Sequence, residues 1–530
     1  MGSLRSDFSL SNTRRTVFRA LLDARKEYGG SKIAIHDADD RKLTYDEIVR
    51  AAFALGSALR KGTRRKEAVG VMLPTGAGAA IAIFALHAYD RVPAMINFTA
   101  GPRNIKRAFD AAQIKRVVTA HAFIEKGELQ PLIDQIKDRV EIVYLEDVRE
   151  SLGVGDKAAG ALGPLVPSLV GIDASPDDPG VILFTSGTEG DPKGVVLSHR
   201  NLVANVHQIL AHVPEALFTS DVVFNPLPTF HCFGLTGGVL LPLLGGMTAA
   251  LHPTPLQAKI IPQRVAATGA TLLFSTDTFL NQYLRASPGD EMNKLRFIVL
   301  GAERVRDETH QLVHRRFKAE LLEGYGATEA SPVIAVNQPG ANRHGTVGRP
   351  LPGVEVKFEE QPGISDGGRL FVKGPNIMSG YLRPDEPGVL KPLADGWHDT
   401  GDVVSPDTEG YLTIRGRLKR FAKIGGEMVS LAVVENVAST LWREHDHAAA
   451  VLPDTRKGEQ IVLLTTNPEA DRGDLVRWAK DHGVNDLAHP RKLYIVESIP
   501  VLGTGKMDIG GVQRLAAELQ AGDAGMRAAE

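Results

Sequence analysis

The chain has 530 residues, more than one hydrophobic core usually holds, so its length predicts at least two domains. It is 43% hydrophobic and 23% charged with a formal net charge of −2, which is typical of a globular protein and gives no indication of nucleic-acid binding. Its one cysteine, Cys232, excludes an internal disulfide bond and favours a reducing, cytoplasmic setting. The apolar stretches 77–86 and 235–251 are too short or too interrupted by glycine and proline to predict a membrane-spanning helix.

Helical and strand-like segments alternate through the first part of the chain. Thr44 and Glu47 have the spacing of a capping box, and apolar residues at helical spacing continue through 48–59. Ser198 is placed to cap a second helix, whose apolar face runs through 202–213. This alternation predicts α/β layers with largely parallel sheets. The strands that we expect lie at 69–73, 181–184, 195–197, 271–275 and 297–301.

The character of the chain changes near residue 345, where glycine and proline become frequent and short β-like runs replace the helices. We therefore expect an α/β protein with a large N-terminal domain over 1–416, made of layered α/β sheets plus a small β-rich subdomain. A small, mobile α+β C-terminal domain is expected over 417–530. Its predicted elements are helices near 430–442 and 472–481 and strands near 447–451, 461–466 and 493–496.

Residues 185–194, TSGTEGDPKG, separate two apolar strands by more residues than a tight turn needs. Successive backbone N–H groups of a glycine-rich turn form a concave anion site, and hydroxyl and lysine side chains add donors. A triphosphate is the expected guest, although the spacing is not that of a Walker P-loop. The alternative is an ordinary surface loop. The candidate phosphate-binding residues are Thr185, Ser186, Gly187, Thr188, Gly190 and Lys193.

Four further motifs follow in order, GYGATEASPV at 324–333, DGWHDTGD at 395–402, GRLKRFAKIGGE at 416–427 and LGTGK at 502–506. With the loop, they resemble the successive core motifs of the adenylate-forming superfamily of acyl-CoA synthetases, peptide-synthetase adenylation domains and luciferases, over nearly the whole chain. The resemblance implies that a carboxylate attacks the α-phosphorus of ATP to give an acyl-adenylate and pyrophosphate, and that a thiol then displaces AMP. The carboxylate is already ionised near neutral pH, so catalysis needs positive charge and alignment of the reactants.

The resemblance also implies a role for each matching residue. Lys506 would reach the carboxylate and the α-phosphate from the C-terminal lobe, and Glu329 would hold Mg²⁺. Thr328 would bind phosphate, and His231 would lie beside the acyl carboxylate. The other residues implied at the nucleotide are Gly324, Tyr325, Gly326, Asp402 and Arg417, with Tyr325 flanking adenine and Asp402 at the ribose. A core histidine, a structural tyrosine or threonine and a turn aspartate are the ordinary alternatives.

Lys419 matches the family hinge, about which the C-terminal lobe rotates between the two steps. Gly425 and Gly426 would line the channel for the pantetheine thiol. Two residues depart from the common family pattern. Glu189 puts a carboxylate into the phosphate loop, where we expect altered loop geometry, and Arg420 stands where an acidic residue is common, so its pairing is left open.

A closer likeness is to the acyl–acyl-carrier-protein synthetase region of the bifunctional 2-acylglycerophosphoethanolamine acyltransferases. It is carried by NFTAG at 97–101, GPNIMSGYLR at 374–383 and KRFAKIGGEMVSL at 419–431. The acyltransferase half is not expected, because none of the 16 histidines has an aspartate five positions later. This likeness implies a medium- or long-chain fatty acid as the substrate and acyl carrier protein as the thiol partner.

Several alternatives stay open at this point. The thiol could belong to CoA, and Glu189 also allows a nucleotide-binding module without ligase activity. The apolar stretch 234–251 suits either the wall of an acyl tunnel or the core. Basic clusters at 64–66, 315–318 and 415–423 suit either an acidic carrier protein or solvent. We expect a cytoplasmic protein and leave open a loose contact with the inner face of the membrane.

Overall fold

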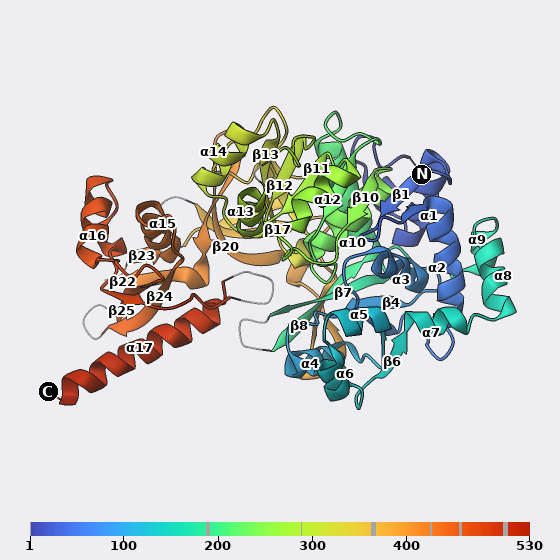
Figure 1. The fold of residues 1–530 in the computed structure, drawn as a ribbon, viewed down its shortest axis with the longest axis horizontal. Coiled ribbons are helices and arrows are strands. Elements are labelled where there is room, and N and C mark those ends of the chain that lie inside the picture. The colour runs from blue at the N-terminus through green and yellow to red at the C-terminus, as the bar shows by residue number, and fades with distance from the viewer. Residues whose placement is uncertain are drawn as a thin grey trace. The chain divides into compact units, whose positions relative to one another are not determined.

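The computed structural model describes residues 2–186, 191–287, 289–361, 367–424, 427–454, 458–501 and 507–529. The chain divides into two compact units, shown in Figure 1. Unit 1 is Met1–Glu355 with Val372–His398, and unit 2 is Val356–Phe371 with Asp399–Glu530. The mixed α/β architecture confirms the expected fold class. The domain boundary expected between residues 416 and 417 stays a prediction.

The first sheet of unit 1 has nine strands among the described residues. The run from β13 to β1 is parallel, while β14, β15 and β2 are antiparallel to their neighbours. Its strands in spatial order are β15 (Arg349–Pro350), β14 (Val333–Val336), β13 (Glu320–Gly326), β12 (Phe297–Leu300), β11 (Leu272–Ser275), β9 (Val222–Asn225), β10 (Thr248–Leu251), β1 (Ile33–His36) and β2 (Lys42–Thr44).

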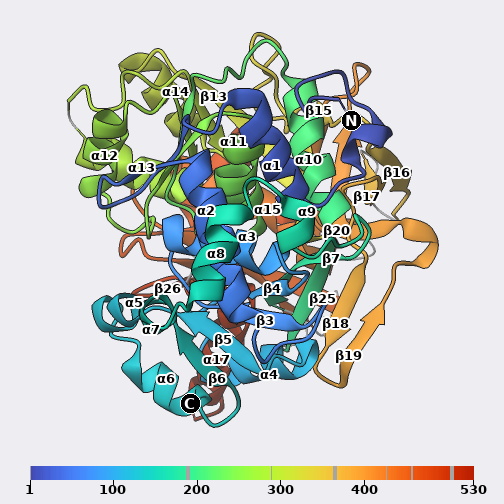
Figure 2. The same cartoon turned by 90° about the vertical axis from the view of Figure 1, so that its right-hand side faces the viewer.

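The second sheet of unit 1 has eight strands in the described part of the chain, parallel from β7 to β6 and antiparallel from β7 to β19. Figure 2 shows β3, β4, β5 and β6 of this sheet, with α4 and α6 nearby. Its strands in spatial order are β19 (Glu386–Lys391), β18 (Gly380–Arg383), β8 (Pro192–Ser198), β7 (Pro179–Ser186), β4 (Val92–Met95), β3 (Ala68–Val71), β5 (Arg116–Thr119) and β6 (Glu141–Tyr144).

One apolar core joins the two sheets of unit 1, because α1, α2, α3 and α10 bury side chains together with residues from both. A second cluster packs α4 and α6 against the other face of the eight-stranded sheet. The helices of unit 1 are α1 (Val17–Tyr28), α2 (Tyr45–Leu59), α3 (Ala77–His87), α4 (Pro102–Ala112), α5 (His121–Lys126), α6 (Gln130–Ile136), α7 (Leu145–Glu150), α8 (Val154–Leu162), α9 (Pro167–Val170), α10 (His199–His212), α11 (Leu241–Leu244), α12 (Ile260–Thr268), α13 (Asp277–Ala286) and α14 (Asp307–Arg316). The short helices are η1 (Leu10–Thr13), η2 (Phe233–Leu240), η3 (Thr328–Ala330) and η4 (Ala394–Gly396).

Both predicted helix caps are confirmed. The Thr44 side chain accepts from the Glu47 N–H and the Glu47 carboxylate accepts from the Thr44 N–H, which completes the capping box of α2. The Ser198 hydroxyl accepts from the Asn201 N–H at 3.1 Å at the start of α10. These side chains satisfy first-turn N–H groups that have no partner within a helix.

The prediction for the phosphate loop is wrong in one respect. We expected irregular chain from residue 185 to 194, but β7 continues through Ser186 and β8 begins at Pro192. The two strands form an antiparallel ladder that pairs Thr185 with Lys193. Backbone hydrogen bonding across this hairpin outweighs the low strand propensity of its glycine and proline. Gly187, Thr188, Glu189 and Gly190 lie outside the described residues.

Unit 2 contains most residues of a four-stranded sheet, together with a five-stranded sheet and its helices, counted over the described residues. The first has the order β16 (Glu355–Glu359), β17 (Gly368–Lys373), β20 (His398–Pro406) and β21 (Leu412–Arg417). The second has the order β23 (Glu427–Ser430), β22 (Phe421–Ile424), β25 (Gly458–Thr465) and β24 (His447–Asp454), with β26 (Lys492–Ile495) on β25. Its helices are α15 (Leu431–Leu441), α16 (Arg472–Asp481), α17 (Ile509–Ala529), η5 (Leu418–Arg420) and η6 (Asp486–Ala488).

The five-stranded sheet is covered by helices on both faces. Ala449 packs with α15 and α16, whereas its neighbours Ala448 and Ala450 pack with α17. Successive strand residues point to opposite faces, so the apolar run in β24 fills both layers. The helices and strands predicted for this region are confirmed to within a few residues.

Among the helices in the described ranges, none is both long and apolar enough to span a bilayer.

Candidate active site

Two candidate residues of unit 1, His231 and Glu329, lie in segments that follow parallel strands of the nine-stranded sheet. His231 lies between β9 and η2, and Glu329 lies in η3, just after β13. Open α/β sheets bind ligands at the carboxyl ends of their strands, because the loops there converge. The sheet therefore brings these two motifs to the edge where a substrate site is expected.

Glu329, Tyr381 and Lys193 form a short chain of contacts. The Tyr381 hydroxyl donates to Glu329 Oε1 at 2.7 Å, and Lys193 Nζ lies 5.7 Å from the centre of the Tyr381 ring. Tyr381 is placed there because β18 pairs with β8, which sets it opposite Val195. The arrangement brings a lysine from the phosphate-loop hairpin and the proposed Mg²⁺ carboxylate close to one tyrosine.

Asn376 connects two sequence motifs that are far apart in the chain. Its side chain is fully buried, and its Nδ2 donates to the Ala330 carbonyl at 2.9 Å and the Val333 carbonyl at 3.2 Å. The Ser331 hydroxyl donates back to the Asn376 carbonyl at 2.8 Å, and the Met378 N–H donates to the Glu329 carbonyl at 2.8 Å. The segment GPNIMS thereby holds the backbone that carries Glu329.

The loop that carries His231 is tied to the ends of two strands in the other sheet. The Thr75 hydroxyl, after β3, donates to the Leu227 carbonyl at 2.8 Å and accepts from the Thr229 N–H at 3.1 Å. Phe98, from the NFTAG motif after β4, packs edge-on against Phe230 with ring centres 5.1 Å apart. His231 is half-buried at this junction of the two sheets.

Cys232 shows that the His231 loop lies near Glu329. Burial raises the pKa of the Cys232 thiol to about 12, the negative charge of Glu329 raises it as well, and the Thr236 hydroxyl lowers it. Cys232 therefore stays a neutral thiol near neutral pH, with no role as a nucleophile.

Other residues of the GYGATE motif line the end of β13 and the start of η3. Gly324 and Tyr325 pair with β14, and Thr328 begins η3. A Cβ at Gly326 would lie 2.3 Å from the Pro332 carbonyl oxygen, so this position requires glycine. The close approach lets the chain turn back directly after the strand and set Glu329 beside Tyr381.

The hairpin of the phosphate loop is held from its C-terminal side. The guanidinium of Arg107, on α4, lies 2.7 Å from the Asp191 carboxylate, and its hydrogen bond lowers the pKa of Asp191. Thr185 is half-buried opposite Lys193, and Ser186 is the last residue of β7. The other three residues predicted to bind phosphate in this loop, Gly187, Thr188 and Gly190, are outside the described ranges.

In unit 2, Asp402 and Arg417 face each other across the ladder of β20 and β21. Arg417 Nε lies 3.2 Å from Asp402 Oδ1, and the Asp402 side chain is 9% exposed whereas that of Arg417 is 63% exposed. The Asp402 N–H donates to the Thr400 hydroxyl at 3.1 Å. The two candidates for the ribose thus form an ion pair with a well-buried carboxylate.

The chain after this ladder carries the predicted hinge. Val403 pairs with Gly416 and Val404 with Ile414, so an extra residue bulges from β21, and Lys419 is exposed in the short helix η5 that follows. Arg420 pairs with Glu435 of α15, so the partner of Arg420 that the sequence left open is an acidic residue of this helix. Gly425, Gly426 and Lys506 lie outside the described residues, so their roles stay predictions.

The apolar stretch 234–251 is buried in the core of unit 1 as η2, α11 and β10. η2 is a π-helix, a rare form that often occurs at functional sites. The buried Asn225 side chain donates to the Gly234 carbonyl at 3.0 Å, and a Cβ at Gly238 would lie 2.0 Å from that side chain. These glycines let η2 pack closely against β9. An acyl tunnel along this stretch stays a prediction.

Several side chains of the basic clusters are bound within the chain. Arg65 pairs with Asp90 at 2.7 Å and Lys66 with Asp178 at 2.8 Å. Arg316 donates to the Leu284 carbonyl at 2.6 Å. Internal pairing reduces the charge that these clusters offer to a carrier protein.

Tyr381 and Asn376 are not among the site residues expected from the sequence. Both belong to GPNIMSGYLR, which was noted only as a motif of likeness. A lone tyrosine or asparagine has no spacing that points to a carboxylate 52 residues earlier. Only the motif as a whole could have indicated these residues, and their contact with the Glu329 segment depends on the pairing of β18 with β8.

Comparison with known proteins shows which proteins the chain resembles as a whole. The family described as AMP-binding enzyme matches residues 22–382. The chain is 27% identical over 532 residues to a medium-chain fatty-acid–CoA ligase of Escherichia coli (strain K12), covering 94% of this chain and 89% of that protein. It is 28% identical over 486 residues to a sulfoacetate–CoA ligase of Cupriavidus necator, covering 89% of this chain and 91% of that protein. The crystal structure of an anthranilate CoA ligase in complex with anthranoyl-AMP shares the fold, with a TM-score of 0.81 at 20% identity over 96% of this chain and 100% of that chain.

Proposed function

The chain belongs to the AMP-binding enzyme family of adenylate-forming enzymes, and on this basis we propose that it is an AMP-forming acid–thiol ligase. Its proposed substrates are a medium- or long-chain fatty acid, ATP and a pantetheine thiol, for which CoA is the first candidate. The single observation that carries the proposal is the grouping of Lys193, Tyr381 and Glu329 beside the loop of His231.

In the first step, a fatty-acid carboxylate oxygen attacks the α-phosphorus of ATP and pyrophosphate leaves. Both reactants are anionic, so the site must supply positive charge and hold them in line. We propose that Lys193 orders the phosphate loop, that His231 lies beside the carboxylate and that Thr328 binds phosphate. Lys506 is proposed to bring the catalytic cation to the carboxylate and the α-phosphate.

Mg²⁺ is the ion that this step would use, and Glu329 suits it. Mg²⁺ is often held by one or two carboxylates together with substrate phosphates. Tyr381 binds one carboxylate oxygen of Glu329 and so orients the other, which would coordinate the ion. When bound, Mg²⁺ would neutralise charge on the phosphates.

In the second step, a thiol attacks the carbonyl carbon of the acyl-adenylate, the thioester forms and AMP leaves. We propose that Asp402, with Arg417, binds the ribose hydroxyls, since a buried carboxylate accepts hydrogen bonds from such groups. Lys419 is the proposed hinge between the two steps, and Gly425 with Gly426 is proposed to admit the thiol.

The proposal is tested by pyrophosphate release from ATP and Mg²⁺ over fatty acids of increasing chain length. We expect release that depends on the acid, with the highest kcat/KM for a medium or long chain. A clear preference for acetate, sulfoacetate or an aryl acid would contradict the proposed acid while leaving the ligase chemistry intact. Absence of acid-dependent release would favour the nucleotide-binding module instead.

Acyl carrier protein is the second candidate acceptor, favoured by the likeness of residues 419–431 to acyl–acyl-carrier-protein synthetases. CoA is favoured by the relatives, among them the fatty-acid–CoA ligase of Escherichia coli. A competition settles the choice: enzyme loaded with acyl-adenylate is offered CoA and holo-acyl carrier protein at equal concentration, and both thioesters are measured. The acceptor with the higher kcat/KM is the physiological class of thiol.

A further inference from the structure

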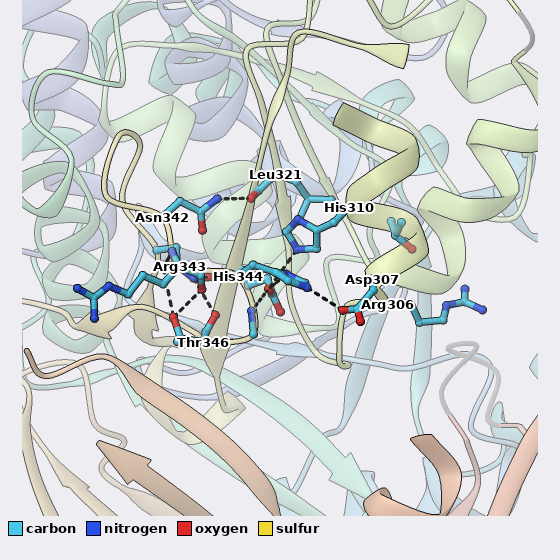
Figure 3. Close-up of polar contacts among 12 residues, drawn as sticks. Arg306, Asp307, His310, Leu321, Asn342, Arg343, His344 and Thr346 are labelled. Carbon is cyan, nitrogen blue, oxygen red and sulfur yellow. Dashed lines mark hydrogen bonds and ion pairs between the residues drawn. The ribbon is translucent and has the colours of Figure 1, made fainter. Parts of the chain in front are cut away.

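A group of two histidines and one glutamate lies in unit 1, and its glutamate directly precedes Gly324 of the GYGATE motif. His310 is on α14, Glu323 is on β13 and His344 is in the loop between β14 and β15. Their possible ligand atoms all lie within 4.8 Å of one another. Figure 3 shows the rings of His310 and His344 facing the same space. We propose that these three residues bind a divalent transition-metal ion of the zinc class.

Two of the distances in this group suit such an ion. His310 Nε2 and His344 Nδ1 each lie 3.2 Å from Glu323 Oε1. Ligands at about 2.0–2.1 Å from a tetrahedral Zn²⁺ lie about 3.3 Å from each other. Two imidazoles and one carboxylate form a common three-residue zinc set, and the two nitrogen ligands disfavour Mg²⁺ and Ca²⁺.

The bonds around Glu323 favour an ion as well. Its side chain is 9% exposed, and Oε1 faces His310, His344 and the Gly345 N–H, which lies 3.1 Å away. A carboxylate oxygen has two lone pairs, so it cannot accept well from all three nitrogens. An ion would take one lone pair and the two imidazole nitrogens, and the Gly345 N–H would keep the other.

Asp307 supplies the outer contact that metal-binding histidines usually have. His344 Nε2 lies 2.7 Å from Asp307 Oδ1. If Nε2 carries the proton and donates it to Asp307, the lone pair of Nδ1 points toward Glu323, as in carboxylate–histidine–zinc triads.

The loop of His344 is already ordered for this role. Asn342 Nδ2 donates to the Leu321 carbonyl at 2.7 Å, and the Thr346 hydroxyl donates to the Arg343 carbonyl at 2.8 Å (Figure 3). The neighbouring cation Arg306 is held away by Asp277 at 2.6 Å. Because the ligand positions are set before binding, little ordering entropy opposes the ion.

The test uses the full chain without an affinity tag, stripped of metal and titrated with Co²⁺ alone, followed by displacement with Zn²⁺. We expect one Co²⁺ per chain with the visible absorption of a four-coordinate site. His310→Gln and His344→Gln should each weaken binding by more than about 100-fold, and Asp307→Asn by about 10–100-fold. His314→Gln changes an exposed histidine one turn further along α14 and should bind as the wild type does.

Thermal unfolding of the metal-free variants checks that each one folds, and His344→Gln, in an exposed loop, serves if His310→Gln does not. Absence of one-to-one Co²⁺ binding to the wild type would overturn the site and leave a proton-linked ion-pair cluster. Binding that survives both His310→Gln and His344→Gln would overturn it too. Neither readout depends on ligase activity, so the proposed function is tested separately.

Discussion

The candidate residues of the two units are held in place by different means. In unit 1, Lys193, Glu329 and Tyr381 come from three distant segments and meet through side-chain contacts, supported by the fully buried Asn376. In unit 2, Asp402 and Arg417 are direct partners in one two-stranded ladder. The first arrangement depends on packing of the whole unit and the second on local pairing. We therefore expect substitutions that loosen packing to affect unit 1 more than unit 2.

Lys506 and Lys193 give the largest contrast in rate. Lys506→Ala should slow acyl-adenylate formation by about 10²–10³-fold, because removing one preorganised donor at a reacting group costs that much. Lys193→Ala, which alters a loop-ordering cation, should mainly raise the KM for ATP. Both are measured by pyrophosphate release. Adenylation by Lys506→Ala at the wild-type rate would refute the proposed role of a C-terminal cation.

His87 makes the stability of unit 1 depend on pH. Burial lowers the pKa of His87 from 6.5 to about 4, and its Nε2 lies 2.6 Å from the Gly180 carbonyl, next to the equally buried His199. Below pH 6.5, His87 binds a proton in the unfolded chain but not in the folded chain. The free energy of unfolding is therefore highest above pH 6.5, and about 3 kcal/mol of it is lost as the pH falls toward 4. Hydrogen exchange of α3 at several pH values measures this loss. His87→Gln keeps a donor for Gly180 and should flatten the profile, and an equal slope in both proteins would contradict the assignment.

Substitutions of Asn376 and Arg417 compare how much the stability of each unit depends on its own contacts. Asn376→Ala removes the side-chain donor of the buried Ala330 carbonyl, while the Val333 carbonyl keeps Asn205, and should cost about 1–3 kcal/mol of stability. Arg417→Ala removes an ion pair with a 63% exposed guanidinium, which should cost less than about 1 kcal/mol. Thermal unfolding of the two variants measures both stability losses. A larger loss for Arg417→Ala would contradict the expectation that unit 1 depends more on its contacts than unit 2.

Tyr381 gives the smallest expected change in rate and tests whether the contacts of unit 1 act together. Tyr381→Phe should lower the adenylation rate about tenfold, since a hydrogen bond to a charged group contributes about 1.5 kcal/mol. In a Glu329→Gln background the same change should have little further effect, because the charged acceptor is already gone. The adenylation rates of the wild type, the two single variants and the double variant give the coupling energy of this double-mutant cycle. Fully additive losses would mean that Tyr381 does not act through Glu329.

The motifs of this chain could be read from the sequence because they are local. The cap of α2 by Thr44 and Glu47 and the cap of α10 by Ser198 depend on neighbours a few residues away. The extension of β7 and β8 into the phosphate loop could not be read in this way, since strand pairing across a hairpin outweighs the preference of single residues.

The sequence by itself determined the order of motifs, the α/β layers and the kind of chemistry, because each rests on residue types at short spacing. Only the tertiary structure decided that Tyr381 orients Glu329, that Asn376 joins their segments, and that His310, Glu323 and His344 share one space. These contacts follow from which strands pair with one another and which helix covers those strands. Strand order is set by the burial of whole faces, a property that no short stretch of residues contains.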